Sequence, residues 1–138
     1  MSHKEAALKS FIGIRRTSDR LLKLAKNDAK QYGLNINEFA VLEVLYHKGP
    51  STVQLITEKI LIANSSTTYI IDQLCLKDLV YRESSCQDRR VCIVHLTKKG
   101  RELIAKSFPC HADRIEEAFE DLEESEMKTL ISLLKRIK

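Results

Sequence analysis

The segment that most constrains the fold is residues 88–100, which joins a charged turn to an alternating strand and then to a helix start. Residues 91–96 alternate as an extended strand does, so that Ile93 and Val94 lie on opposite faces. Thr97 follows at the position of a helix N-cap, where its hydroxyl can accept a hydrogen bond from a first-turn N–H group. The segment therefore predicts the second strand of a β-hairpin wing, with a charged tip, leading directly into a helix.

Length and composition limit the fold class. The chain has 138 residues, 43% of them hydrophobic and 30% charged, which fits one globular domain with a sizeable core. It contains four glycines and two prolines, so long helices are favoured over a turn-rich all-β fold. No run of about 18 apolar residues occurs, and the charged N-terminal segment lacks the apolar stretch of a signal peptide. We therefore expect a mainly α-helical, cytoplasmic protein with a small β-hairpin wing and no membrane contact.

Two helices are predicted in the first third of the chain. Apolar residues recur at three- and four-residue steps over residues 5–32, which indicates a long amphipathic helix that Gly33 ends. Asn35 and Glu38 have the spacing of a capping box, so a second helix is expected to begin there. The Gly-Pro pair at residues 49–50 ends that helix.

A helix-turn-helix is predicted next. Residues 51–54 open a short third helix that ends near Lys59, and Asn64 can cap a fourth helix over residues 65–77. The fourth helix would bury one face, formed by Thr67, Ile70, Ile71 and Leu74. Its outer face carries hydroxyl and amide groups able to hydrogen-bond phosphates and base edges in a DNA major groove, namely Ser65, Ser66, Thr68, Tyr69 and Gln73. Any solvated amphipathic helix also has a polar face, so this signal alone does not decide for DNA.

The order of the elements strengthens the interpretation as a DNA-binding fold. Residues 79–81 form a first wing strand, the polar turn 83–88 follows, and residues 90–96 return as the second strand. A helix-turn-helix followed directly by a hairpin is a winged helix. Residues 34–96 carry six basic and seven acidic side chains, so bulk charge does not favour nucleic acid. DNA contact would instead depend on three wing arginines, Arg82, Arg89 and Arg90.

The C-terminal part, residues 98–138, is predicted to be helical. Pro109 lacks an N–H group and should kink or interrupt the first of these helices near residues 105–108. The last helix, at about residues 123–137, has an apolar face that is broad enough to need a partner.

With these elements in place, the chain resembles the MarR family of bacterial winged helix-turn-helix transcriptional regulators along nearly its whole length. The resemblance rests on residues 73–82, at the end of the fourth helix, and on the Asp-Arg-Arg run at residues 88–90. The Val-His-Leu-Thr-Lys-Lys-Gly run at residues 94–100 completes it, and residues 38–42 look like the family's second helix.

The resemblance implies a homodimer that binds a pseudo-palindromic double-stranded DNA operator. One domain would span residues 1–138, with a DNA-binding lobe at about residues 34–97. The dimerisation helices would be at about residues 1–32 and 98–138. By the same resemblance, the wing arginine enters the minor groove while an aspartate holds its guanidinium in a charge-assisted pair, the two residues being Arg90 and Asp88.

The sequence departs from the family pattern at three places. Asp78 stands where a glycine usually precedes the leucine-valine pair, so that helix end needs a different cap. Pro109 falls within a dimerisation helix. The recognition helix has no arginine or lysine before Lys77, and its Asp72 could repel phosphate, so DNA affinity would depend on the wings and on lysines such as Lys59 and Lys77.

The signal to which such a regulator responds stays open. Repressors of this family are commonly released by a small molecule, here expected to be phenolic or apolar. Parts of residues 11–22, 39–47 and 103–114 would line the cleft for such an effector. Zinc is an alternative signal through His47 and His111, but no metal-ligand spacing occurs, so neither a metal nor a cofactor is expected.

A thiol-based switch is a further alternative. The four cysteines include no C-x-x-C pair, so neither a zinc knuckle nor a redox pair is indicated. Cys75 and Cys92 are expected in the core as small hydrophobic residues. A reactive thiol would be Cys86, in the polar wing tip near the arginines, or Cys110.

Two rival classes of function remain to be weighed. The sequence contains no G-x-S-x-G motif, no Gly-rich phosphate loop and no nucleophile beside its scattered histidines, so we predict that the protein is not an enzyme. A winged helix that binds another protein and not DNA would use the same fold. Binding of the promoter upstream of its own gene would separate these alternatives.

Overall fold

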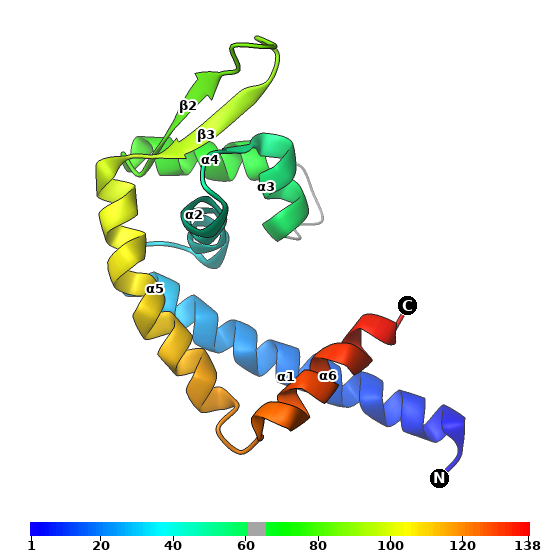
Figure 1. Ribbon diagram of the computed structural model, residues 1–138. Coiled ribbons are helices and arrows are strands. Elements are labelled where there is room, and N and C mark those ends of the chain that lie inside the picture. Colours follow the sequence, from blue (N-terminus) through cyan, green and yellow to red (C-terminus); the bar gives the residue numbers. More distant parts are fainter. Residues whose placement is uncertain (61–65) are drawn as a thin grey trace.

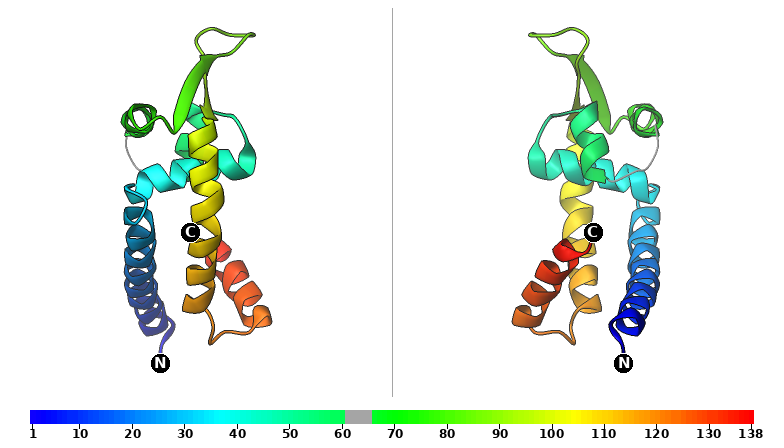
Figure 2. Two further views of the ribbon diagram at one scale, coloured as in Figure 1. Left: turned by 90° about the vertical axis from the view of Figure 1, so that its left-hand side faces the viewer. Right: turned by 90° about the vertical axis from the view of Figure 1, so that its right-hand side faces the viewer.

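The computed structural model describes residues 1–60 and 66–138. In chain order these residues form α1 (His3–Lys30), α2 (Ile36–Lys48), β1 (Ser51–Thr52), α3 (Val53–Ile60), α4 (Thr67–Leu76), β2 (Val80–Ser84), β3 (Cys92–Leu96), α5 (Lys98–Ala118) and α6 (Glu124–Arg136). We call α2 to β3 the winged lobe, and α1, α5 and α6 the arms (Figure 1). Figure 2 shows that the arms extend from the winged lobe on the side opposite the wing. None of the described helices is long and apolar enough to cross a membrane.

The hydrophobic core lies in the winged lobe, around α2. The α2 side chains of Val41, Leu42 and Leu45 are buried. They pack with buried apolar side chains from α3, α4 and the wing, namely Ile56, Ile70, Ile71, Leu74, Leu79, Val80 and Val94. From the arms, Ala29 and Ile104 join this core, both near the winged lobe. The predicted buried face of the fourth helix is confirmed.

Local hydrogen bonds set the helix ends as the sequence predicts. α1 ends at Lys30, and the turn that follows it closes at Gly33, which has a φ of 72°, with the Leu34 N–H donating to the Ala29 carbonyl at 3.1 Å. Asn35 and Glu38 form the predicted capping box. The Glu38 N–H donates to Asn35 Oδ1 at 2.8 Å, and the Asn35 N–H donates to Glu38 Oε1 at 2.9 Å.

The junction of α4, β2 and α5 is closed by backbone contacts. Asp78 adopts the left-handed conformation (φ 59°) that glycine favours, and the Leu79 N–H donates to the Leu74 carbonyl at 3.0 Å. Thr97 is the predicted N-cap, because its Oγ1 accepts a hydrogen bond from the Gly100 N–H at 2.9 Å and donates to the Asp78 carbonyl at 2.7 Å. The sequence predicted a different cap where Asp78 replaces the family's glycine. The structure shows that Asp78 instead adopts the backbone conformation that glycine would have.

The sheet has the order β1-β3-β2, with both pairs antiparallel. In the hairpin, Val80 pairs with Leu96 and Ser84 with Cys92, so the first strand runs further into the predicted turn than expected. β1 was not predicted, because residues 51–54 were expected to open a helix. Thr52 does both: it pairs with β3, and its Oγ1 accepts a hydrogen bond from an N–H of α3.

Of the two outcomes predicted at Pro109, a kink or an interruption, the interruption does not occur. α5 is one helix from Lys98 to Ala118 with Pro109 inside it. Figure 1 shows that α5 changes direction near its middle, which agrees with a kink. A proline removes one N–H donor and therefore one i→i−4 hydrogen bond, which a helix of 21 residues can lose without ending.

Candidate nucleic-acid interface

The helix-turn-helix consists of α3 and α4. The two helices are joined by a 2.8 Å hydrogen bond from Thr57 Oγ1 to Thr67 Oγ1, which gives the buried Thr67 hydroxyl a partner. On the other side of α4, Thr68 and Tyr69 are exposed and Gln73 is half-buried. Ser66, half-buried, precedes the helix, whereas Ser65 and the predicted cap Asn64 lie outside the described residues. The structure thus places the described candidate readers on or next to one face of α4.

Arg82 of β2 binds three residues of α4, the helix predicted to be the recognition helix. Its Nη2 lies 2.6 Å from Asp72 Oδ1 and donates to the Thr68 carbonyl at 3.3 Å, while Nη1 lies 3.6 Å from Cys75 Sγ. The pKa of the Arg82 guanidinium is raised: burial alone would lower it, but the hydrogen bond and the charge of Asp72 outweigh burial. Asp72 is therefore neutralised by an ion pair, which lessens the expected repulsion of phosphate.

The wing tip carries an arginine held by its own turn. The Arg90 N–H donates to Asp88 Oδ1 at 3.0 Å, and Arg90 Nε donates to the same oxygen at 3.3 Å. The Arg90 side chain is nevertheless 92% exposed. Arg89 and Cys86 are also exposed on this turn. The structure thus brings Asp88, Arg89 and Arg90 together at the point of the wing that lies furthest from the arms (Figure 1).

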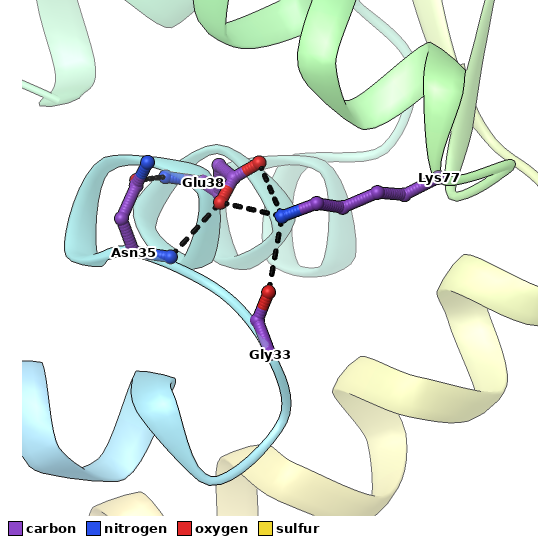
Figure 3. Close-up of polar contacts among 4 residues, drawn as sticks. All are labelled: Gly33, Asn35, Glu38 and Lys77. Carbon is purple, nitrogen blue, oxygen red and sulfur yellow. Dashed lines mark hydrogen bonds and ion pairs between the residues drawn. The ribbon is translucent and has the colours of Figure 1, made fainter.

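Lys77, one of the two lysines expected to contribute to DNA affinity, forms hydrogen bonds within the protein. Its Nζ donates to both carboxylate oxygens of Glu38 at 2.9 Å and to the Gly33 carbonyl at 3.0 Å (Figure 3). An ammonium group has three N–H donors, so these three acceptors occupy all of them. Lys59 is exposed at the end of α3. Of the two lysines, Lys77 is thus paired within the protein although its side chain is 40% exposed, and Lys59 is exposed.

A second polar cluster joins the arms to the winged lobe. Asp28 of α1 is almost completely buried, and its carboxylate lies 2.9 Å from both His111 Nδ1 and Arg114 Nε of α5. His111 Nε2 lies 3.7 Å from Glu43 Oε1 of α2. Burial raises the pKa of the Glu43 carboxyl, and the nearby His111 and His47 only partly offset this. The cluster therefore links α1, α2 and α5 in the region expected to hold an effector.

Two aromatic rings, those of Phe39 and Phe108, lie close to His111 of this cluster. The Phe39 and His111 ring centroids are 5.2 Å apart, and those of His47 and Phe108 are 4.5 Å apart, both in edge-to-face geometry. Among the described residues, no group of three or more His, Cys, Asp and Glu side chains is placed to hold a metal ion.

The burial of the four cysteines agrees with the prediction for two of them and in part for the other two. Cys86 and Cys110 are exposed, as candidate reactive thiols must be. Cys75 and Cys92 are half-buried and lie at the edge of the core, because both belong to the region where the wing meets α4. Cys75 packs against the core, so the prediction that both are small hydrophobic residues of the core is met in part.

Similarity to known proteins shows the family to which this chain belongs. A family model described as "Transcriptional regulator SarA/Rot" matches residues 23–107. The HTH-type transcriptional regulator MhqR of Bacillus subtilis (strain 168) is 41% identical over 133 residues, which cover 96% of this chain and 92% of MhqR. The chain belongs to the SarA/Rot family. It is a transcriptional regulator of the MarR/SarA winged-helix type and not an enzyme, as the sequence predicts.

Solved structures show the same MarR/SarA fold. A putative MarR-like transcription regulator from Bacillus cereus ATCC 10987 has a TM-score of 0.82 and 24% identity, over 96% of this chain and 95% of that one. The S. aureus MepR–DNA complex has a TM-score of 0.80 and 21% identity, over 92% of this chain and 93% of that one. The predicted winged-helix fold class is confirmed.

Three features of this regulator were not predicted from the sequence: the tight contact at Gly100 and the ion-pair partners of Arg82 and Lys77. A Cβ atom on Gly100 would lie 2.0 Å from the Leu79 carbonyl oxygen, so only glycine fits there. A glycine inside the first turn of a helix was the available signal. The Arg82–Asp72 pair and the Lys77–Glu38 pair gave no local signal, because each joins different elements.

Proposed function

We propose that this regulator is a homodimeric repressor that binds a pseudo-palindromic DNA operator through its two winged lobes. The observation that carries the proposal is the wing-tip pair, in which Asp88 fixes an otherwise exposed Arg90. An arginine held on a turn loses less entropy on insertion, and its fork suits the narrow, negative minor groove of DNA. A similarly folded protein, MepR, has been solved with DNA, which supports DNA as the partner.

The winged lobe, at about residues 34–97, would divide its contacts between two grooves. The outer face of α4 would read the major groove with the side chains of Ser65, Ser66, Thr68, Tyr69 and Gln73. Arg89 would contact phosphate beside the minor groove that receives Arg90. Arg82 has a different role in this proposal: because it is committed to Asp72, it holds the wing against α4 and does not itself read DNA.

The arms, at about residues 1–32 and 98–138, would pair two copies of the chain. Large apolar side chains lie exposed on α1 and α6, namely Leu8, Phe11, Ile12, Ile131, Leu133 and Leu134. An apolar groove between α5 and α6 is lined in part by Ile115, Phe119 and Met127. Exposed apolar side chains in such numbers mark a protein interface, and a second copy would cover them.

Charge also favours a second copy on the arms. Residues 1–33 carry eight basic and three acidic side chains, whereas residues 113–126, at the turn between α5 and α6, carry eight acidic side chains and one basic. In a symmetric dimer, α1 of one protomer can meet the acidic turn of the other, and the two contacts are then equal.

We further propose that a small phenolic or apolar molecule releases the operator. Aromatic rings of α2 and α5 lie beside the buried Asp28 and the half-buried Glu43, so a phenol would meet both an apolar wall and hydrogen-bond acceptors. Titration of the operator complex with a panel of phenols, with benzoate and cyclohexanol as controls, tests this. Release by none of the phenols would refute the effector class.

A thiol-sensing version of the same function is favoured by the exposure of Cys86 at the wing tip. Peroxide would oxidise this thiol to a sulfenic acid and would itself be reduced to water. Mass spectrometry after mild peroxide treatment locates the modified residue, and Cys86→Ser and Cys110→Ser show which thiol matters for release. Peroxide-insensitive DNA binding would refute this version.

The decisive experiment is a gel shift with duplex DNA from upstream of the protein's own gene. Arg90→Ala is expected to weaken specific binding about tenfold to a hundredfold. Arg89→Ala should weaken binding to all sequences alike, and Lys106→Ala, on the exposed surface of α5 and outside the basic α1 and the acidic turn, controls for the lost charge. The dimer should persist in all three variants. Unchanged operator binding by Arg90→Ala would refute the wing assignment, and a wild-type protein that binds no DNA would favour a protein-interaction role.

A further inference from the structure

Lys77 crosses from the end of the recognition helix to the corner between α1 and α2. Figure 3 shows its extended side chain reaching Glu38, at the start of α2, and Gly33, just after α1. All three hydrogen bonds of the ammonium group are 2.9 to 3.0 Å long. The residue therefore joins the end of α4 to the α1–α2 corner, which lies about forty residues earlier in the sequence.

The Glu38 carboxylate, which accepts from Lys77, is also held by contacts of its own. Glu38 is 3% exposed, and Oε1 already accepts the capping hydrogen bond from the Asn35 N–H. A buried carboxylate is costly unless it is paired and hydrogen-bonded, so Lys77 has a strong reason to stay in place. Hydrogen bonds are directional, so those between the Glu38 carboxylate and Lys77 Nζ fix where the end of α4 lies. Apolar packing between α2 and α4 is not directional and would not fix it in the same way.

Lys77 is also tied to the second arm. Its carbonyl oxygen accepts a hydrogen bond from Lys99 Nζ, at the start of α5, at 3.2 Å. The end of α4 is thus connected to α1 through Gly33 and to α5 through Lys99. Both arms lead away to the exposed apolar surfaces that would pair two protomers.

We propose that Lys77 is a positioning residue that fixes the recognition helix relative to the arms and so sets the operator spacing that the dimer accepts. The inference rests on the proposed homodimeric DNA binding. Two recognition helices read half-sites about one helical turn apart, and one added base pair moves a half-site by about 3.4 Å. A helix end that is free to shift by a few ångströms would therefore tolerate such a change.

The test compares wild-type protein with Lys77→Met and Glu38→Gln. Methionine keeps an apolar stem without the ammonium, and glutamine still forms a capping box while losing the charge that Lys77 needs. Lys106→Met, on the exposed surface of α5, controls for loss of one positive charge. The probe is a pool of synthetic duplexes in which the two half-sites selected by the wild-type protein are set at the preferred spacing or at one base pair more or less.

The wild-type protein and Lys106→Met should prefer one spacing. Lys77→Met and Glu38→Gln should lose about tenfold in affinity at that spacing and much less at the altered spacings, so that the preference flattens. Equal losses at every spacing, or an unchanged preference, would overturn the inference even if the melting temperature falls.

Two further readouts separate the possible failures. The double variant Lys77→Met/Glu38→Gln removes both charges, so it avoids an unpaired buried carboxylate and should fold even if one single variant does not. It should show the same flattened preference, and a wild-type preference in the folded double variant would also overturn the inference. A wild-type protein that selects no duplex at all would instead overturn the proposed function itself.

Discussion

The winged lobe and the arms use their apolar side chains in opposite ways. In the winged lobe, Leu42, Ile71 and Val94 have no exposed surface. In the arms, Leu8 is 57% exposed, and α6, all of whose residues are described, has none buried. Because burial of apolar surface is the main favourable term in folding, the winged lobe is complete within one chain. The arms reach the same condition only when another molecule covers them.

The largest expected effect contrasts one core residue with one arm residue. Leu42→Ala should lower the free energy of unfolding by about 2–5 kcal/mol, because it leaves a cavity beside α3 and α4. Urea unfolding should show this loss at every protein concentration. Leu8→Ala, by contrast, should matter only where the protein is dimeric, so its effect should fade on dilution. Equal, concentration-independent losses would contradict the distinction between the two regions.

The next largest effect concerns the arms alone. Ile131→Asp places a charge on the exposed apolar face of α6, and a symmetric interface contains the change twice, so dimer affinity should fall roughly a hundredfold. Analytical ultracentrifugation measures the shift from dimer to monomer. Leu76→Asp, at an exposed apolar position of the winged lobe, should leave the dimer intact. A dimer unaffected by Ile131→Asp would place the interface elsewhere.

The same contrast explains which features could be predicted from the sequence. Helix starts were found correctly at Asn35 and Thr97, because a cap is made by groups within three residues of each other. The wing was found from the alternation of residues 91–96, in which Val94 is buried and its neighbours are half-buried. Such signals are local, and the winged lobe is rich in them.

Pairs between elements could not be found in this way. Lys77 meets Glu38, which lies 39 residues away, and His111 meets Asp28, which lies 83 residues away. Their partnership depends on how the helices pack, and no local spacing records that. The strand β1 escaped prediction for the same reason, since its two residues become a strand only by pairing with β3.

A smaller effect is expected at Asp78, where the winged lobe departs from its otherwise favourable local geometry. Among the described residues, Asp78 alone of the non-glycine residues has a positive φ. Asp78→Gly should remove this strain and raise the free energy of unfolding by about 0.5–1 kcal/mol, after the entropy gained by the unfolded chain is subtracted. Thermal unfolding measures the gain, and Asp78→Ala should be destabilising at the same site. A loss of stability in Asp78→Gly would mean that the aspartate side chain has a stabilising role.

The smallest expected effect lies where the two regions meet. Burial raises the pKa of Glu43, against the opposing charges of His111 and His47, so the folded protein holds this proton to a higher pH than the unfolded chain does. Stability contributed by the neutral carboxyl is therefore present at low pH and is lost as pH rises from the usual value of 4.5 through the folded-state pKa.

Glu43→Gln, which remains neutral, should consequently be more stable than wild type at pH 7, by no more than about 0.5 kcal/mol because the side chain is partly exposed to solvent. The difference should vanish near pH 3, well below the usual value of 4.5, where the wild-type carboxyl is protonated in both states. Urea unfolding of both proteins at the two pH values measures it, with Glu58→Gln on the surface of α3 as the control for lost charge. If Glu43→Gln is instead less stable at pH 7, the ionised Glu43 carboxylate stabilises the protein. The contact between Glu43 of the winged lobe and His111 of the arms would then act as an ion pair.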